Sequence, residues 1–177
     1  HMGDIGAICN DAAFAILHTH FGGLREQILR ASNAAFGHRL MMDRIVPGGV
    51  AADLEDGGLK TLIQVVATIR KALPRLTEVY DETNSLQDRT VGTGIVRAEW
   101  VRQFAAGGFI GRASGRPFDS RRWRPYERYQ GLAFAPPVLN EGDVNARVWL
   151  RIREMEQSLG MLDELLAGDR PGTGLRD

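Results

Sequence analysis

The residues best suited to chemistry are arginines and carboxylates gathered between positions 112 and 128. This segment holds six arginines against Asp119 and Glu127, with four aromatic side chains among them, Phe118, Trp123, Tyr126 and Tyr129. Arginines and aromatics together can bind the phosphates and bases of single-stranded nucleic acid. Arginines paired with carboxylates can instead hold an irregular loop in one shape. No other part of the chain supplies a basic groove, so we expect ion pairs here and no nucleic-acid partner.

A second candidate is Asp4, near the start of the first expected helix. From the residues alone, a carboxylate at this place is a helix cap or a solvated side chain. Metal ligands are scarce. His18 and His20 lie two residues apart, so on a helix they point about 200° away from each other and cannot share one ion. The single cysteine, Cys9, cannot form a four-thiolate centre. We therefore predict that this chain binds no metal and no iron–sulfur cluster.

Composition favours one globular domain. A chain of 177 residues can bury a substantial core. Its 22 cationic side chains balance 22 anionic ones, so no overall field draws it to nucleic acid or to an acidic membrane. No apolar run approaches the roughly 20 residues that cross a bilayer. We therefore expect no direct membrane insertion and a cytoplasmic location, with any membrane association made through partners.

The spacing of apolar residues predicts a mainly α fold, a helix bundle with an irregular segment and short strands. Gly22 and Gly23 are expected to separate the first two helices, and Pro74 to kink the third. Asp143 suits the N-cap of the last helix. Residues 107–141 show no sustained period and are expected to be ordered irregular chain with short strands. The expected helices cover residues 4–18, 24–36, 57–83, 97–106 and 143–167.

Several short blocks of the sequence follow one another in an order that belongs to a known family. They cover residues 3–7, 44–50, 53–54, 89–94, 112–115, 119–126, 142–143 and 151–158. This order resembles the large-subunit family shared by the quinone-site subunit of respiratory complex I and the group 4 nickel–iron hydrogenases, including formate hydrogenlyase. The resemblance runs over nearly the whole chain and implies a fragment of a hydrogenase-large-subunit-like fold.

The resemblance also implies roles for particular residues. Asp4 matches the aspartate that, in the complex I subunit, pairs with a histidine on an N-terminal loop beside the quinone head group, which implies a quinone-side carboxylate. The arginine-rich segment matches a stretch that shapes the wall facing the iron–sulfur small subunit. NADH is oxidised elsewhere in complex I, and this sequence contains no nicotinamide site. The residues implied to face a partner are Arg112, Ser114, Asp119, Arg121, Arg124 and Tyr126.

The function implied is that of part of an oxidoreductase large subunit, in which a partner's iron–sulfur centre passes electrons to quinone or to protons. Hydrogenases of the family hold nickel with two Cys-x-x-Cys pairs, and this sequence has neither. We therefore expect no cofactor in this chain, a quinone or nickel–iron centre in the intact parent, and no turnover by the isolated fragment. The alternative is a non-catalytic assembly or interaction domain of such a complex.

The fragment interpretation divides the chain at its two ends. Residues 1–2 resemble a cloning remnant, residues 3–168 form the helical core domain, and residues 169–177 form a tail or truncated linker. Surfaces built to meet missing segments would face water, and such apolar patches normally mark interfaces. We expect them around Ile5, Ile8 and Cys9 and around Phe118, Trp123 and Tyr126, with self-association through at least one of them.

Overall fold

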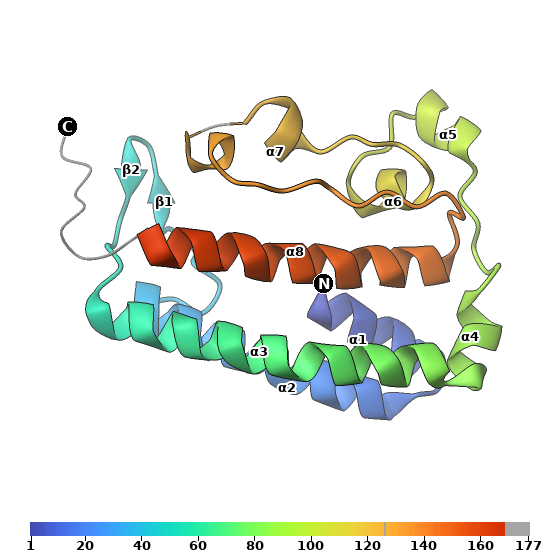
Figure 1. Ribbon diagram of the computed structural model, residues 1–177, viewed down its shortest axis with the longest axis horizontal. Coiled ribbons are helices and arrows are strands. Elements are labelled where there is room, and N and C mark those ends of the chain that lie inside the picture. The colour runs from blue at the N-terminus through green and yellow to red at the C-terminus, as the bar shows by residue number, and fades with distance from the viewer. Residues whose placement is uncertain (126, 169–177) are drawn as a thin grey trace.

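Apolar residues three and four positions apart form the long helices of this protein, as a computed structural model shows (Figure 1). The structure describes residues 1–125 and 127–168. The α-helices are α1 (Met2–Asp11), α2 (Ala15–Phe36), α3 (Asp56–Glu82), α4 (Asn84–Thr90), α5 (Ala98–Gln103), α6 (Gly108–Ala113), α7 (Ser120–Trp123) and α8 (Val144–Gly168). A 3-10 helix, η1, covers Glu127–Gln130, and the antiparallel strands β1 (Ile45–Val46) and β2 (Gly49–Val50) form a hairpin. The mainly α fold is therefore confirmed.

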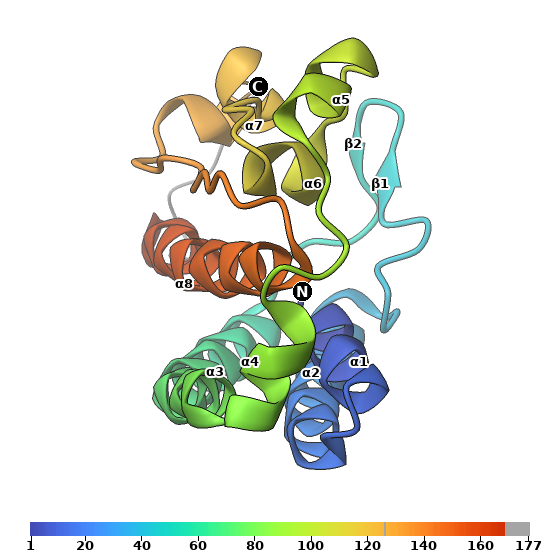
Figure 2. The same ribbon diagram turned by 90° about the vertical axis from the view of Figure 1, so that its right-hand side faces the viewer.

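Helix α8 forms the middle layer of the molecule. Helices α1, α2 and α3 lie on one side of it, and the short helices α5, α6 and α7 lie on the other (Figures 1 and 2). The β1–β2 hairpin stands beside the C-terminal end of α8, at the opposite end of the molecule from α4 (Figure 1). Because α8 is covered on two sides, both of its faces must carry side chains that are suited to burial.

The main core lies between α1, α2, α3 and α8. The predicted apolar stripe of α8 faces this core, and its members Ile152 and Leu159 are 1% and 6% exposed, as expected. Tyr80 of α3 is fully buried, and its hydroxyl donates to the Asn145 side-chain oxygen at 2.8 Å. Burial raises the pKa of Tyr80 to about 12. A smaller cluster on the other face of α8 contains Ala113, Ala146 and Leu150, with Phe109 and Leu139 packed against it.

The first helix break is not where the glycines predicted it. Helix α1 ends at Asp11, and a turn follows in which Ala13 has a φ of 60°. Phe14 N–H donates to the Cys9 carbonyl at 2.8 Å across this turn. Gly22 and Gly23 lie inside α2, so the prediction of a break there was wrong. Each glycine costs a helix only about 1 kcal/mol, and packing of α2 against α1 and α3 outweighs that cost.

The last helix begins as predicted, because Asp143 caps it. Its Oδ1 accepts from Ala146 N–H at 2.7 Å, and its Oδ2 accepts from Gly92 N–H at 2.7 Å. The prediction of strands within residues 107–141 was wrong, since the strands of the described chain are β1 and β2. In that segment the backbone N–H groups form single hydrogen bonds to separate carbonyls and not the regular series of a β-sheet. Gly115 N–H, for example, donates to Leu139 O at 2.7 Å. Pro74 lies inside α3, where the kink stays a prediction.

Candidate functional site: buried ion pairs on either side of α8

A buried arginine joins the irregular segment to α8. Arg112 of α6 is 6% exposed, and its Nε donates to Glu154 Oε1 at 2.8 Å. Its Nη2 bonds to the same carboxylate oxygen, and its Nη1 donates to the Phe118 carbonyl at 3.1 Å. The Nη1 atom also lies 3.4 Å from Asp119 Oδ2, and the second oxygen of Glu154 lies 3.0 Å from His1 Nε2. Since Glu154 is 4% exposed, both charges of the Arg112–Glu154 pair are removed from water and each depends on the other.

Asp119 extends the network to a second arginine. Arg121 forms a two-pronged pair with it, Nε to Oδ1 at 3.0 Å and Nη2 to Oδ2 at 2.7 Å. Asp119 also caps α7 by accepting from the Arg121 backbone N–H at 3.0 Å. Hydrogen bonding from the Arg121 side chain holds the pKa of Asp119 below its ordinary value. The expected network of arginines and carboxylates is thus present, and it fixes α6 and α7 against α8.

Two glycines allow separate loop segments to approach each other closely around this network. Gly142 has a φ of 67°, and a Cβ placed there would lie 2.3 Å from the Val96 carbonyl oxygen. Gly115 has a φ of 84°, and its Cβ would lie 2.9 Å from the Asn140 side chain. Ser114, which is 2% exposed, lies in this crossing. Ser114 therefore helps pack the segment and offers no surface to a partner.

Asp4 belongs to a second ion pair, on the α1 side of α8. Its carboxylate Oδ2 accepts from Arg151 Nε at 3.2 Å. The Arg151 side chain is only 7% exposed, whereas the Asp4 side chain is 60% exposed. Arg151 is held independently of Asp4, because its guanidinium lies 3.8 Å over the Phe109 ring and its Nη1 donates to the Arg147 carbonyl at 3.0 Å. A fixed cation therefore positions an accessible carboxylate, which also lies in the first turn of α1, where the helix dipole favours negative charge.

The predicted site residues separate into different places. Arg112, Asp119 and Arg121 come together, while Asp4 lies in the other pair. Arg124 is exposed, and Tyr126 lies outside the described residues. Sequence reasoning missed Glu154 and Arg151 as partners, although both fall in the block 151–158 and lie three residues apart on α8. Two opposite charges at that spacing share one face of a helix, and this was the signal available.

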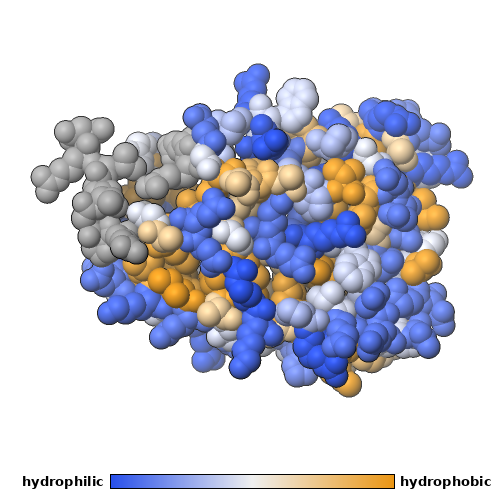
Figure 3. All heavy atoms as spheres, in the orientation of Figure 1, coloured by the Kyte–Doolittle hydropathy of each residue, from blue (hydrophilic) through white to orange (hydrophobic). Residues whose placement is uncertain are grey.

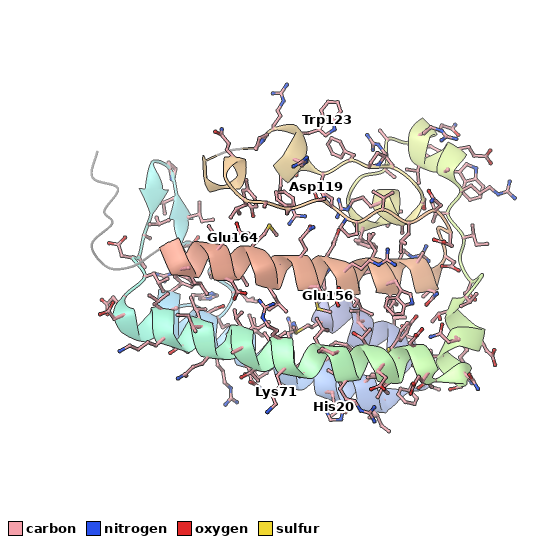
Figure 4. The ribbon with its side chains drawn as sticks, viewed as in Figure 1. His20, Lys71, Asp119, Trp123, Glu156 and Glu164 are labelled. Carbon is pink, nitrogen blue, oxygen red and sulfur yellow. The ribbon has the colours of Figure 1, made fainter. Side chains whose placement is uncertain are left out.

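The exposed surface differs from the sequence expectation on one face. Ile5 and Cys9 are fully buried in the bundle, so the predicted apolar patch at the N-terminal face was wrong. Met2, assigned to a cloning remnant, is 8% exposed and belongs to the same core. Trp123 is 70% exposed and lies at the outer edge of the molecule, away from α8, whereas Asp119 lies on the inner side (Figure 4). Trp123 of the second predicted patch is therefore available to a partner, and Phe118 is half-buried.

An apolar cleft opens at the end of the bundle near the hairpin. Its volume is about 690 Å³, and its walls come from α2, α3, α8 and the segment around β2. Apolar side chains also gather on the face shown in Figure 3, over the C-terminal part of α8 and the neighbouring α3. Charged groups at the cleft are few and include Arg25 and Asp53. A smaller cleft of about 370 Å³ touches the arginine network at Arg112, Asp119 and Arg121.

The profile of the respiratory-chain NADH dehydrogenase 49 Kd subunit family matches residues 12–173, and the chain belongs to that family. It is 34% identical over 142 residues to a subunit of the NADH-quinone oxidoreductase of Ehrlichia chaffeensis, covering 80% of this chain and 36% of that protein. It is 31% identical over 142 residues to a subunit of the F(420)H(2) dehydrogenase of Methanosarcina mazei, covering 80% and 38%.

A solved structure supports the same relationship. A chain of the membrane-bound sulfane sulfur reductase, an archaeal respiratory membrane complex, superposes with a TM-score of 0.89 at 27% identity. The match covers 99% of this chain and 47% of that one. This protein spans about a third of the length of the curated relatives it matches. No helix in the described part is long and apolar enough to cross a membrane.

Proposed function

We propose that this chain supplies the helical core of an oxidoreductase large subunit, in which Asp4 is a quinone-side carboxylate and the arginine-rich layer faces an iron–sulfur partner subunit. The observation that carries the quinone part is the Asp4–Arg151 pair. A 3.2 Å bond from a buried guanidinium orients a carboxylate whose side chain stays 60% exposed. A carboxylate in this state is fixed in direction and reachable, so it can accept a hydrogen bond from a proton-donating group beside a quinone, such as the histidine with which its match in the complex I subunit pairs.

The partner-facing part of the proposal rests on charge and exposed aromatic area. Residues 97–125 contain seven arginines and two carboxylates, although the whole chain carries no net charge. Trp123, Phe104 and Trp100 are 70%, 74% and 44% exposed on the same layer. Arginine and aromatic side chains are enriched at protein interfaces. The surface therefore suits a protein partner with acidic groups and an apolar centre, and the buried pairs beneath it keep its shape fixed.

The quinone part is tested with a short-chain benzoquinone added to the isotope-labelled chain. We expect saturable chemical-shift changes at Asp4, Arg151 and Phe109, and their loss in Asp4→Asn. The matched control is Asp11→Asn, which removes the same charge from the exposed C-terminal end of α1. No turnover is expected, because the electron donor lies on a partner. Absence of any saturable change at Asp4 would contradict the quinone assignment.

The alternative function is that of an assembly or interaction domain without catalysis. It assigns a role to the partner surface and no role to Asp4. It predicts that Trp123→Ala weakens binding to the iron–sulfur partner subunit, while Asp4→Asn changes neither partner binding nor quinone binding. Measuring both variants against both probes separates the two functions.

A further inference from the structure

A histidine side chain holds the loop that follows α2. Helix α2 ends at Phe36, and its C-cap is Gly37, whose φ is 76° and whose N–H donates to the Asn33 carbonyl at 2.9 Å. Directly afterwards, His38 Nδ1 accepts two backbone hydrogen bonds, from Leu40 N–H and from Met42 N–H, each at 3.2 Å. One ring nitrogen therefore closes two turns of the loop at once.

Such an arrangement requires one protonation state of the imidazole. A nitrogen that accepts hydrogen bonds must present its lone pair, so the neutral ring carries its proton on Nε2. When the ring is protonated, Nδ1 becomes a donor and faces two other donors. Both hydrogen bonds are then lost together, and no small rotation of the ring restores an acceptor at that place.

The loop has few other restraints and carries strain. Met41 and Asp43 have φ values of 55° and 57°, in the left-handed region that costs a side-chain-bearing residue about 1 kcal/mol or more. The other backbone bonds of residues 38–44 are Met41 N–H to His38 O at 3.0 Å, Arg44 N–H to Met41 O at 3.3 Å and Ala51 N–H to Arg44 O at 2.9 Å. The histidine bonds are thus a large share of what keeps this conformation.

The loop also presents apolar side chains. Leu40, Met41 and Met42 are 56%, 50% and 58% exposed. Met41 lines the apolar cleft, together with Val50 from the hairpin that the loop leads into. A change in the loop therefore changes the wall of the cleft and the exposed apolar surface beside it.

We propose that His38 is a proton-operated latch on residues 38–44. In its neutral form it holds Met41 in the wall of the cleft; protonation releases the loop and withdraws Met41 from that wall. The binding surface of the hairpin end of the molecule is thereby coupled to pH. This device does not depend on the proposed role of Asp4.

The charges around the loop do not supply this control by pairing with the ring. No ion pair joins His38 to a carboxylate in the part of the chain that the structure describes. Arg39 donates to Glu26 of α2 at 2.7 Å, which occupies both side chains. The charged groups on the loop and on the segments next to it include Arg25, Glu26, Arg30, Arg39, Asp43, Arg44, Asp53, Glu55 and Asp56. The acceptor role of Nδ1 is therefore the specific link between proton and loop.

The test follows the labelled chain by NMR from pH 8 to pH 5, across the range where imidazoles ordinarily titrate, about pH 6.5. At pH 8 we expect ring ¹⁵N shifts of the Nε2–H tautomer. As His38 protonates, we expect amide exchange protection at Leu40 and Met42 to fall about tenfold, the effect of losing these hydrogen bonds. The Gly37 amide, bonded to Asn33, should keep its protection.

Two variants separate the latch from general acid effects. In His38→Asn, a side-chain oxygen can accept from the backbone without titrating, so we expect protection at residues 40 and 42 to become independent of pH. His20→Gln, an exposed site on the outer side of α2 (Figure 4), should leave the wild-type response unchanged. An Nδ1–H tautomer at pH 8, protection at these amides that ignores pH in the wild type, or an unaltered pH response in His38→Asn would each overturn the proposal.

Discussion

Replacing Arg112 by methionine removes the cation that joins α6 to α8. Glu154 would keep its burial, with an exposed fraction of 4%, and its contact with His1, but lose two hydrogen bonds from Arg112. Breaking a buried pair in this way costs about 3–5 kcal/mol, because the remaining charge stays out of water. Asp119 retains the two-pronged pair with Arg121. We therefore place the loss of unfolding free energy near the lower end, at about 3 kcal/mol.

The double variant at Arg112 and Glu154 should lose less stability than Arg112→Met alone. Replacing both Arg112 and Glu154 by methionine removes the buried charges together, and apolar replacement of such pairs is often neutral or stabilising. We expect the double variant to be more stable than Arg112→Met alone by at least about 2 kcal/mol. Stability equal to the sum of the two single losses would refute the view that the cost lies in an unpaired buried charge.

The assay is equilibrium urea unfolding at pH 7, followed by far-ultraviolet circular dichroism, with the slope checked for two-state behaviour. The control is Arg75→Met, which breaks an ion pair with Glu78 on the exposed side of α3. Exposed pairs contribute little, so its urea midpoint should match the wild type. A large shift in the control would mean that charge removal itself, and not burial, controls the outcome.

Three further predictions follow from single groups. Hydrogen bonding from the Arg121 side chain lowers the pKa of Asp119. The ionised Asp119 side chain therefore contributes its full stabilisation above the ordinary carboxyl pKa of about 3.9, and this contribution is lost as the pH falls towards and through the lowered pKa. Between pH 7 and pH 3, urea midpoints should fall less steeply in Asp119→Asn than in the wild type. Burial raises the pKa of Cys9 to about 11, so a thiol reagent at pH 8 should label the native chain only as fast as it opens, and immediate stoichiometric labelling would contradict this. Gly142→Ala places a Cβ 2.3 Å from a backbone oxygen at positive φ and should destabilise by about 1–3 kcal/mol, whereas Gly22→Ala, with open space around it, should stabilise α2 by up to about 1 kcal/mol.

The local sequence pattern was sufficient to predict burial wherever one face of a helix packs against a single core. The spacing of Ile152, Met155 and Leu159 identified the buried side of α8, and all three are buried. Asp143 was recognisable as a cap because the groups that it satisfies lie within its own helix start. Its second bond, to Gly92 at 51 residues' separation, could not be predicted, since nothing local brings those groups together.

Only part of the candidate site could be predicted from the sequence. The density of arginines around Asp119 indicated ion pairs, and Arg121 lies two residues away from it, within reach of local reasoning. Arg112 instead meets Glu154 across 42 residues, and Asp4 meets Arg151 across 147. Which carboxylate a given arginine chooses depends on how α8 is placed between two layers, and helical period alone carries no information on that placement.

By itself, the sequence determined the helical class, the burial stripe of α8, the cap at Asp143 and the order of blocks that marks the family. Those features follow from periodicity and short-range hydrogen bonding, which act within a few residues. Tertiary structure alone decided the break after α1 and the burial of Ile5 and Cys9. It also decided that Arg112 pairs with Glu154 and Arg151 with Asp4. Each of these depends on contacts between distant segments, because a buried charge or an apolar face is stable only when the packed fold supplies its partner.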